Sequence, residues 1–359
     1  MYRKNSIIIE EWLKSSNKAL LVTGARQTGK TWLIREEIAK SEYTKFEVNF
    51  IDQPDLVDYL NVKMSAEEFL VKLKMIMPED CKPQETVVFF DEIQKCPEIV
   101  TKIKFLVEEG SFKYVMSGSL LGVELKGIAS VPVGYLTVLK MYPMDFEEFM
   151  VANNVSKMTL EMLKEKFETC QPVDEFIHQK LLSLFFIYLI VGGMPDAVKT
   201  YIATKDIREV DKVQRDIITN DTGLLTSAYS AEIKLELINK NSEINNGAHF
   251  ENAVVQQLTA NGLEPYFCKK KNIGELDAVI EMGGKVVPIE VKSGKAYKSH
   301  KALDNFMNIP DYHLEKAYVL SAANLEQEGA VVYLPIYMCY LLKEREIGKL
   351  IVDLNMEGL

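Results

Sequence analysis

An eight-residue segment, Gly24 to Thr31, constrains this chain more than any other part of its sequence. It reads Gly-Ala-Arg-Gln-Thr-Gly-Lys-Thr and matches the pattern GxxxxGK[ST] in full. The segment follows an apolar stretch at residues 18–24 and precedes a helical pattern at residues 30–41. In that context the glycines let backbone N–H groups surround phosphates, and the start of the helix adds positive potential. A glycine turn that fits by chance is the alternative, expected in roughly one chain in a hundred.

The segment supplies the first half of an ATP site. Lys30 is expected to reach the β- and γ-phosphates of ATP, and Thr31 is expected to bind Mg²⁺. The residues that we predict to surround the phosphates are Gly24, Ala25, Arg26, Gln27, Thr28, Gly29, Lys30 and Thr31.

Two acidic residues supply the second half. Residues 86–90 form an apolar stretch without a polar break, and Asp91 and Glu92 follow it. Ligands of parallel sheets bind at the carboxyl ends of the strands. We therefore expect Asp91 to bind Mg²⁺ through water, and Glu92 to be the catalytic residue that orients or deprotonates the attacking water. A surface acidic pair at the start of a loop is the alternative.

The next apolar stretch, residues 114–116, ends in hydroxyl groups. Ser117 and Ser119 are therefore candidate ATP-binding residues that would sense the γ-phosphate, but a serine-glycine sequence after a strand is also common in turns. Candidates for an arginine that completes the site, on composition alone, are Arg26, Arg208 and Arg215.

Apolar stretches and helical patterns alternate through the first third of the chain. Continuously apolar strands separated by helices indicate a parallel sheet covered on both faces, and hence an α/β domain. A helical pattern extends from residue 145 to about 215 and is interrupted by Gly192, Gly193 and Pro195. We expect a helical lid over residues 150–220, in which this interruption forms a structural corner. A segment that does not respond to ATP is the alternative.

A second acidic cluster lies in the last third of the chain. Strand patterns at residues 275–281 and 285–292 flank Gly283-Gly284, a strong signal for a two-residue hairpin turn. With residue 282 opposite residue 285, Asp277 lies opposite Glu290. The apolar side of this hairpin is then formed by Leu276, Ala278, Ile280, Val287, Ile289 and Val291.

The polar side of the predicted hairpin carries Asp277, Glu290 and Lys292. Two carboxylates about 5 Å apart can share a divalent metal, and a nearby lysine can stabilise a metal-bound hydroxide. We therefore predict that these three residues are catalytic in metal-assisted phosphodiester hydrolysis. Asp277, Glu290 and Glu251, on the preceding helix, are the candidate ligands of Mg²⁺ or Mn²⁺. A solvated hairpin face with paired charges is the alternative.

Charge and composition limit the partners that the chain can have. It contains 52 acidic and 42 basic residues, and a net charge of −10 argues against a protein that coats DNA generally. Residues 269–301 instead carry a net positive charge, with eight lysines and four acidic residues. This charge suits contacts with a phosphate backbone, and a solvated lysine face is the alternative.

Several features predict a cytoplasmic protein without membrane contact. The longest apolar run, residues 181–191, is too short for a membrane helix and indicates a buried core helix. Residues 1–10 lack the pattern of a signal peptide. The five cysteines are scattered without a CxxC pair, so neither a zinc site nor a disulfide framework is expected.

On these residues the chain resembles the prokaryotic AAA-type ATPases that carry a C-terminal domain of unknown function with a restriction-endonuclease-like core. The resemblance covers roughly residues 1–220 and 247–300. The segments that carry it are residues 24–31, 90–97, 117–122, 132–134, 142–149, 191–195, 250–252, 275–277 and 288–292.

The resemblance implies an α/β protein with four parts. These are a P-loop AAA-type ATPase core with a parallel sheet at residues 1–149, a helical lid at 150–220, a linker at 221–246, and a C-terminal α/β restriction-endonuclease-like domain at 247–359. In the PD-(D/E)xK motif of that last fold, the matching positions are Asp277, Glu290 and Lys292, with Glu251 on its helix.

One departure from the family concerns the linker. Relatives carry a helical, winged-helix-like stretch between two segments that here, at residues 215–218 and 221–225, are almost adjacent. Either this chain has lost that module or part of it is absent from the sequence. Because the module could carry contacts with DNA or a partner, its absence weakens the prediction of those roles.

Two functions remain open from the sequence. The first is an ATPase coupled to a nuclease-like C-terminal domain in nucleic-acid processing or defence, which would use ATP, Mg²⁺ and a second Mg²⁺ or Mn²⁺. The second is an ATP-dependent regulatory switch whose C-terminal domain binds DNA or another protein without cleaving it. Either function is compatible with an oligomer.

Overall fold

The computed structural model describes residues 1–119, 134–220, 247–271 and 274–344. Contacts between Cα atoms divide the chain into two compact units. The first unit combines Met1–Met144 with Val191–Ala228, and the second combines Asp145–Ile190 with Tyr229–Leu359.

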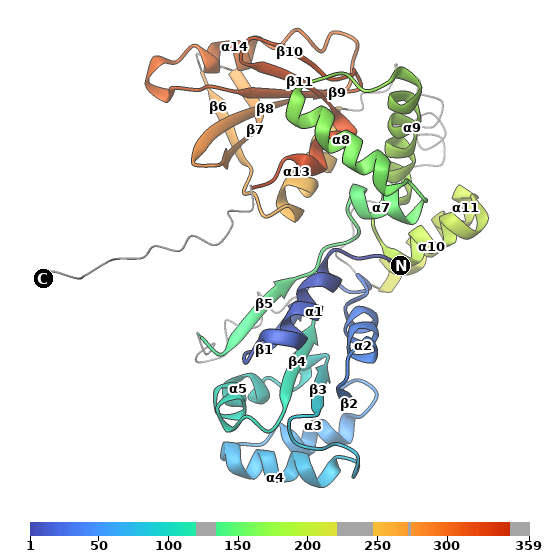
Figure 1. The fold of residues 1–359 in the computed structure, drawn as a ribbon, viewed down its shortest axis with the longest axis vertical. Coiled ribbons are helices and arrows are strands. Elements are labelled where there is room, and N and C mark those ends of the chain that lie inside the picture. Colours follow the sequence, from blue (N-terminus) through green and yellow to red (C-terminus); the bar gives the residue numbers. More distant parts are fainter. Residues whose placement is uncertain (120–133, 221–246, 272–273, 345–359) are drawn as a thin grey trace, which may run out of the picture. The chain divides into compact units, whose positions relative to one another are not determined.

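A five-stranded parallel sheet forms the centre of the first unit (Figure 1). Its strands stand in the order β2, β3, β4, β1, β5, and every neighbouring pair is parallel. The parallel sheet predicted from the apolar stretches is therefore confirmed. The strands are β1 (Ala19–Thr23), β2 (Thr44–Asn49), β3 (Thr86–Asp91), β4 (Lys113–Gly118) and β5 (Leu136–Lys140).

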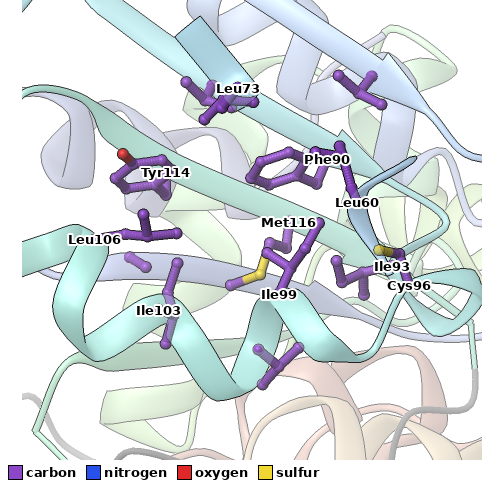
Figure 2. Close-up of a cluster of buried hydrophobic side chains, with 14 of the residues drawn as sticks. Leu60, Leu73, Phe90, Ile93, Cys96, Ile99, Ile103, Leu106, Tyr114 and Met116 are labelled. Atoms are coloured by element: carbon purple, nitrogen blue, oxygen red, sulfur yellow. The ribbon is translucent and has the colours of Figure 1, made fainter. Parts of the chain in front are cut away.

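Helices cover both faces of this sheet. Phe90 of β3 lies in a buried cluster with residues of α4 and α5, shown in Figure 2, and its neighbour Phe89 lies in a second cluster with residues of α1 and α2. Alternate residues of a strand point to opposite faces, so burial on both sides explains why β3 is apolar throughout. The helices of this unit are α1 (Asn5–Ser15), α2 (Lys30–Lys40), α3 (Pro54–Leu60), α4 (Ala66–Ile76), the 3₁₀ turn η1 (Ile93–Lys95), α5 (Glu98–Glu109), α10 (Pro195–Thr204) and α11 (Ile207–Asn220).

A six-stranded mixed sheet forms the centre of the second unit. The order is β10, β11, β9, β8, β7, β6; β6, β7 and β8 are antiparallel neighbours, whereas β8, β9 and β11 are parallel. The strands are β6 (Tyr266–Lys270), β7 (Gly274–Met282), β8 (Lys285–Lys292), β9 (Ala317–Ser321), β10 (Glu326–Glu328) and β11 (Val331–Pro335).

Helix α13 packs against β8 of this sheet, and α14 packs against β7 and β8. The described helices of the second unit are α7 (Phe146–Ala152), α8 (Lys157–Thr169), α9 (Glu175–Val191), α13 (Gly247–Ala260), α14 (Lys301–Met307), and the 3₁₀ turns η4 (Pro310–Tyr312) and η5 (Ile336–Leu341). As predicted, the apolar run at residues 181–191 belongs to a core helix, because six of its side chains are buried. Among the described helices, none has the length and apolar character needed to cross a membrane.

The compact units differ from the predicted domain boundaries. Helices α7 to α9 pack with the C-terminal residues: the ring centroids of Phe185 and Phe250 lie 6.3 Å apart, and Nδ1 of His178 lies 3.0 Å from the hydroxyl of Tyr337. Helices α10 and α11 instead belong to the first unit. The predicted lid at 150–220 is therefore divided between the two units, and the predicted linker at 221–246 lies outside the described residues.

The interruption at Gly192–Pro195 is a corner, as predicted. Gly192 has a φ of +70°, and Pro195 stands in the first turn of α10. Gly193 is required for another reason, because a Cβ built on it would lie 2.1 Å from the carbonyl oxygen of Met144. The N–H of Met144 donates to the carbonyl of Gly193 at 2.7 Å, so two distant segments touch through their backbones.

Candidate functional sites

The phosphate loop connects β1 to α2. Gly24, directly after β1, has a φ of +154°, and a Cβ there would lie 2.0 Å from the carbonyl oxygen of Met141. Gly29 has a φ of +89° and caps the N-terminus of α2. Both positions therefore need glycine, the first for close backbone approach and the second for its left-handed conformation.

The side chain of Lys30 lies over this loop. It is 7% exposed, and its ammonium group donates to the carbonyl oxygens of Gly24 at 3.0 Å and Ala25 at 2.7 Å. Thr28, fully buried, donates its hydroxyl to the Ala25 carbonyl at 2.9 Å. A buried cation therefore stands at the N-terminus of α2, where the partial positive charge of the helix already favours anions.

Asp91 brings together side chains from four strand or helix ends. The hydroxyl of Thr31 lies 3.1 and 3.0 Å from its two oxygens, and the hydroxyl of Ser117 also donates to it. The amide of Asn49, at the end of β2, lies 3.4 Å away. Sequence reasoning did not single out Asn49, although a polar residue at the carboxyl end of a buried strand is a usable signal.

Glu92 follows Asp91 in a left-handed backbone conformation, with φ 58° and ψ 46°. Its N–H donates to Asp91 at 3.1 Å, and its carboxylate accepts from the amide of Gln94. That amide also lies 3.4 Å from the hydroxyl of Ser119. Gln94 was not predicted, because nothing in its sequence position shows that its side chain turns back to Glu92.

The structure does not select among the three candidate arginines. Arg26 lies exposed in the phosphate loop, Arg208 pairs with Asp206 at 2.9 Å on the surface, and Arg215 belongs to α11.

Comparison with protein families identifies the first part of the chain. Residues 16–150 match the family described as an AAA domain. Over these residues the chain is therefore similar to AAA-type P-loop ATPases. Residues 246–338 match a domain of unknown function, DUF4143. No curated protein has a sequence that matches the chain.

Three solved structures similar to parts of the chain all have low sequence identity to it. A Walker-type ATPase of Pyrococcus abyssi is 13% identical, with 75% of this chain and 91% of that chain covered and a TM-score of 0.36. The branch migration motor RuvB of Thermotoga maritima is 12% identical, with coverages of 74% and 79% and a TM-score of 0.33. DnaA of Aquifex aeolicus, bound to AMPPCP, is 10% identical, with coverages of 74% and 81% and a TM-score of 0.34.

The residues of the ATPase domain fit a nucleotide with Mg²⁺. The Thr31 hydroxyl and the Asp91 carboxylate, the two groups predicted to bind the ion, are hydrogen-bonded to each other beside the start of α2. Oxygen groups of this kind are the ligands that Mg²⁺ prefers. The buried ammonium of Lys30 adds a positive charge at the same end of α2.

In the C-terminal unit, the hairpin has the predicted register. Residue 282 pairs with residue 285, and the ladder continues without a shift to Ala278 opposite Ile289. At the next position Asp277 turns its carboxylate to the backbone, and accepts from the N–H of Val291 at 2.7 Å. The six residues predicted to form the apolar side are all buried.

The polar residues of this hairpin are more buried than a solvated face would be. Glu290 is 5% exposed, and one of its oxygens accepts from the ammonium of Lys292 at 2.6 Å. Its other oxygen, Oε2, is buried without a hydrogen-bond partner. Burial raises the pKa of Glu290 above its ordinary value, and repulsion from Asp277 adds to this effect, whereas Lys292 opposes it. The solvated-face interpretation therefore does not fit Glu290.

Glu251, on α13, faces the same charges. Burial raises its pKa, and repulsion from Asp277 and Glu275 adds to the shift, which Lys292 opposes. Burial likewise raises the pKa of Asp277, whereas the hydrogen bond from the Val291 N–H and the charge of Lys292 lower it. Within the described residues, however, no group of three or more His, Cys, Asp and Glu side chains is arranged to hold a metal ion.

Proposed function

We propose that the AAA-type ATPase domain is coupled to a C-terminal domain that cleaves phosphodiester bonds in nucleic acid. The observation that carries this proposal is the buried carboxylate of Glu290, which has one oxygen paired with Lys292 and one oxygen without a partner. An unpaired buried carboxylate oxygen is costly unless a ligand or metal uses it.

In the ATPase domain, the proposed roles follow from position. Lys30 would meet the β- and γ-phosphates, while Thr31 and Asp91 would hold Mg²⁺. Glu92 would accept the proton of the attacking water, and its contact with Gln94 keeps the carboxylate beside Ser119. Ser117, bonded to Asp91, would report the occupation of the metal position.

In the C-terminal domain, Asp277 and Glu290 would hold Mg²⁺ or Mn²⁺, with Glu251 as a further ligand. When bound, such an ion supplies Lewis acidity and lowers the pKa of a water molecule. The ammonium of Lys292 would stabilise negative charge that develops on the phosphate oxygens. The raised carboxylate pKa values fit this role, because a cation would relieve the repulsion among the acidic groups.

One observation favours the regulatory switch as the second candidate. Lys292 already neutralises Glu290 through its ion pair, and the described residues contain no ready three-ligand metal group. A domain that only binds DNA or a protein could use the same charges as structural pairs.

The test uses the full chain with supercoiled DNA, single-stranded DNA and RNA, with Mg²⁺ or Mn²⁺ and with or without ATP. We expect metal-dependent cleavage that D277N and K292A abolish. E281Q is the matched control, because Glu281 lies exposed on the same strand. Cleavage that persists in D277N would contradict the proposed site. DNA binding without cleavage by the wild-type chain would favour the switch.

A further inference from the structure

A buried arginine outside the phosphate loop binds the backbone of that loop. Arg3 is 5% exposed, although arginine is seldom buried without partners. Its Nη1 group donates to the carbonyl oxygen of Thr28 at 2.7 Å, and its Nη2 group donates to the carbonyl oxygen of Tyr142 at 2.7 Å. One planar guanidinium thus connects the phosphate loop to the segment that follows β5.

The contact with the Thr28 carbonyl determines the orientation of the peptide group that joins Thr28 to Gly29. In a trans peptide the carbonyl of one residue and the N–H of the next point in opposite directions. Because Arg3 draws the Thr28 carbonyl towards itself, the N–H of Gly29 must point away from Arg3. Gly29 is the N-cap of α2 in a left-handed conformation, and phosphate loops bind their ligand through such N–H groups.

The contact with Tyr142 fixes the other side of the loop. The neighbouring residue Met141 donates its N–H to Thr23 at 2.7 Å, and its carbonyl lies where a Cβ of Gly24 would be. The first glycine of the loop therefore rests on residues 141–142, and Arg3 ties this support to the last part of the loop.

The backbone of Arg3 is itself held at the start of α1. The carbonyl of Arg3 accepts from the N–H of Ser6 at 3.1 Å and from its hydroxyl at 2.7 Å, at the start of that helix. Further along α1, Ile9 and Trp12 are buried in the same cluster as residues of α2. The backbone from which the Arg3 side chain extends therefore cannot shift without disturbing the beginning of α1.

We propose that Arg3 is a positioning residue of the nucleotide site, which orients the Gly29 N–H towards the phosphates of a bound nucleoside diphosphate or triphosphate. The proposal rests on ATP binding by the AAA domain. Arg3 acts through the loop backbone and does not itself need to touch the nucleotide. Lysine cannot replace it fully, because its single ammonium lacks the planar fork that spans two carbonyls.

The test is calorimetric titration of the full chain with Mg-ADP. We expect R3A to bind about ten-fold to a hundred-fold more weakly, the range for losing a charge-assisted hydrogen bond. R3K, which keeps the charge, should lie between R3A and the wild type. K14A is the matched control, because Lys14 is an exposed cation on α1, and it should bind as the wild type does.

Two further measurements distinguish a positioning role of Arg3 from a purely structural role. I9A weakens the docking of α1 and keeps the Arg3 side chain, since Ile9 is fully buried in the core; it should lower the unfolding temperature and leave ADP affinity unchanged. Millimolar methylguanidinium should restore part of the affinity of R3A and none of the stability of I9A.

Each outcome decides the proposal. Wild-type affinity in folded R3A would overturn it, and so would wild-type affinity in R3K if R3A does not fold. An equal loss of affinity in I9A would also overturn it, because α1 docking alone would then explain the effect. Absence of ADP binding in the wild-type chain would instead refute the nucleotide site itself.

Discussion

Replacing Lys30 by alanine tests the central interaction of the nucleotide site. The ammonium now donates to the carbonyls of Gly24 and Ala25, within a loop that is otherwise built of backbone. A nucleotide would attract the same ammonium towards its phosphates. The variant removes this charge and leaves the loop glycines in place.

The expected magnitude follows from two opposing effects. Two unit charges 4 Å apart interact by about 4 kcal/mol at an effective dielectric constant near 20. Against this, a hydrogen bond from a charged group, such as those to Gly24 and Ala25, is worth about 1.5–3 kcal/mol and is partly given up on binding. The difference, about 1–2.5 kcal/mol, corresponds to a dissociation constant that is roughly five-fold to seventy-fold larger in the variant.

Calorimetric titration with Mg-ATP and Mg-ADP measures this effect. K113A is a matched control: Lys113 is also partly buried and donates to a backbone carbonyl, that of Ser16, at 2.6 Å, but it lies at the opposite end of the sheet's strands. K113A should lose stability and keep its affinity for ATP. A folded K30A variant with an unchanged dissociation constant would refute the reasoning.

Three other predictions concern single residues. E92Q should bind ATP as the wild type does but lose at least about 100-fold in phosphate release, because glutamine cannot accept the proton; full turnover would exclude Glu92 as the base. G193A should lose at least about 2 kcal/mol in urea unfolding, since its Cβ would meet the Met144 carbonyl at 2.1 Å, whereas G192A should lose only about 1 kcal/mol. Because burial raises the pKa of Glu290, the fold binds its proton more tightly than the unfolded chain does, and stability should fall as pH rises through and above the ordinary value of 4.5. E290Q should flatten this dependence in melting curves without divalent ions, and an equal slope would contradict it.

Much of the ATPase core and the hairpin of the C-terminal unit could be predicted because their signals are local. The loop from Gly24 to Thr31, the apolar strand before Asp91 and the turn at Gly283-Gly284 each depend on a few adjacent residues. Parallel-strand geometry then brings Thr31, Asp91 and Ser117 together without further information.

The missed features all depend on contacts between residues far apart in the chain. Arg3 reaches a loop 25 residues away and a carbonyl 139 residues away, and no local pattern reports either contact. Helical periodicity showed that residues 145–215 form helices, but it cannot show that α9 packs with Phe250 while α10 packs with the first unit. The burial of Glu290 was missed for the same reason, because alternation in β8 does not reveal what covers its polar face.

The way the chain passes between its two units also matters while the protein is being made. The chain leaves the first unit after Met144 and returns at Val191, where the Met144–Gly193 hydrogen bond brings the two crossings together. The apolar helix α9 therefore emerges from the ribosome long before its partners in α13 and η5 have been synthesised. Its exposed face is a surface that chaperones would recognise, and truncation before residue 247 would remove both partners and leave that face uncovered.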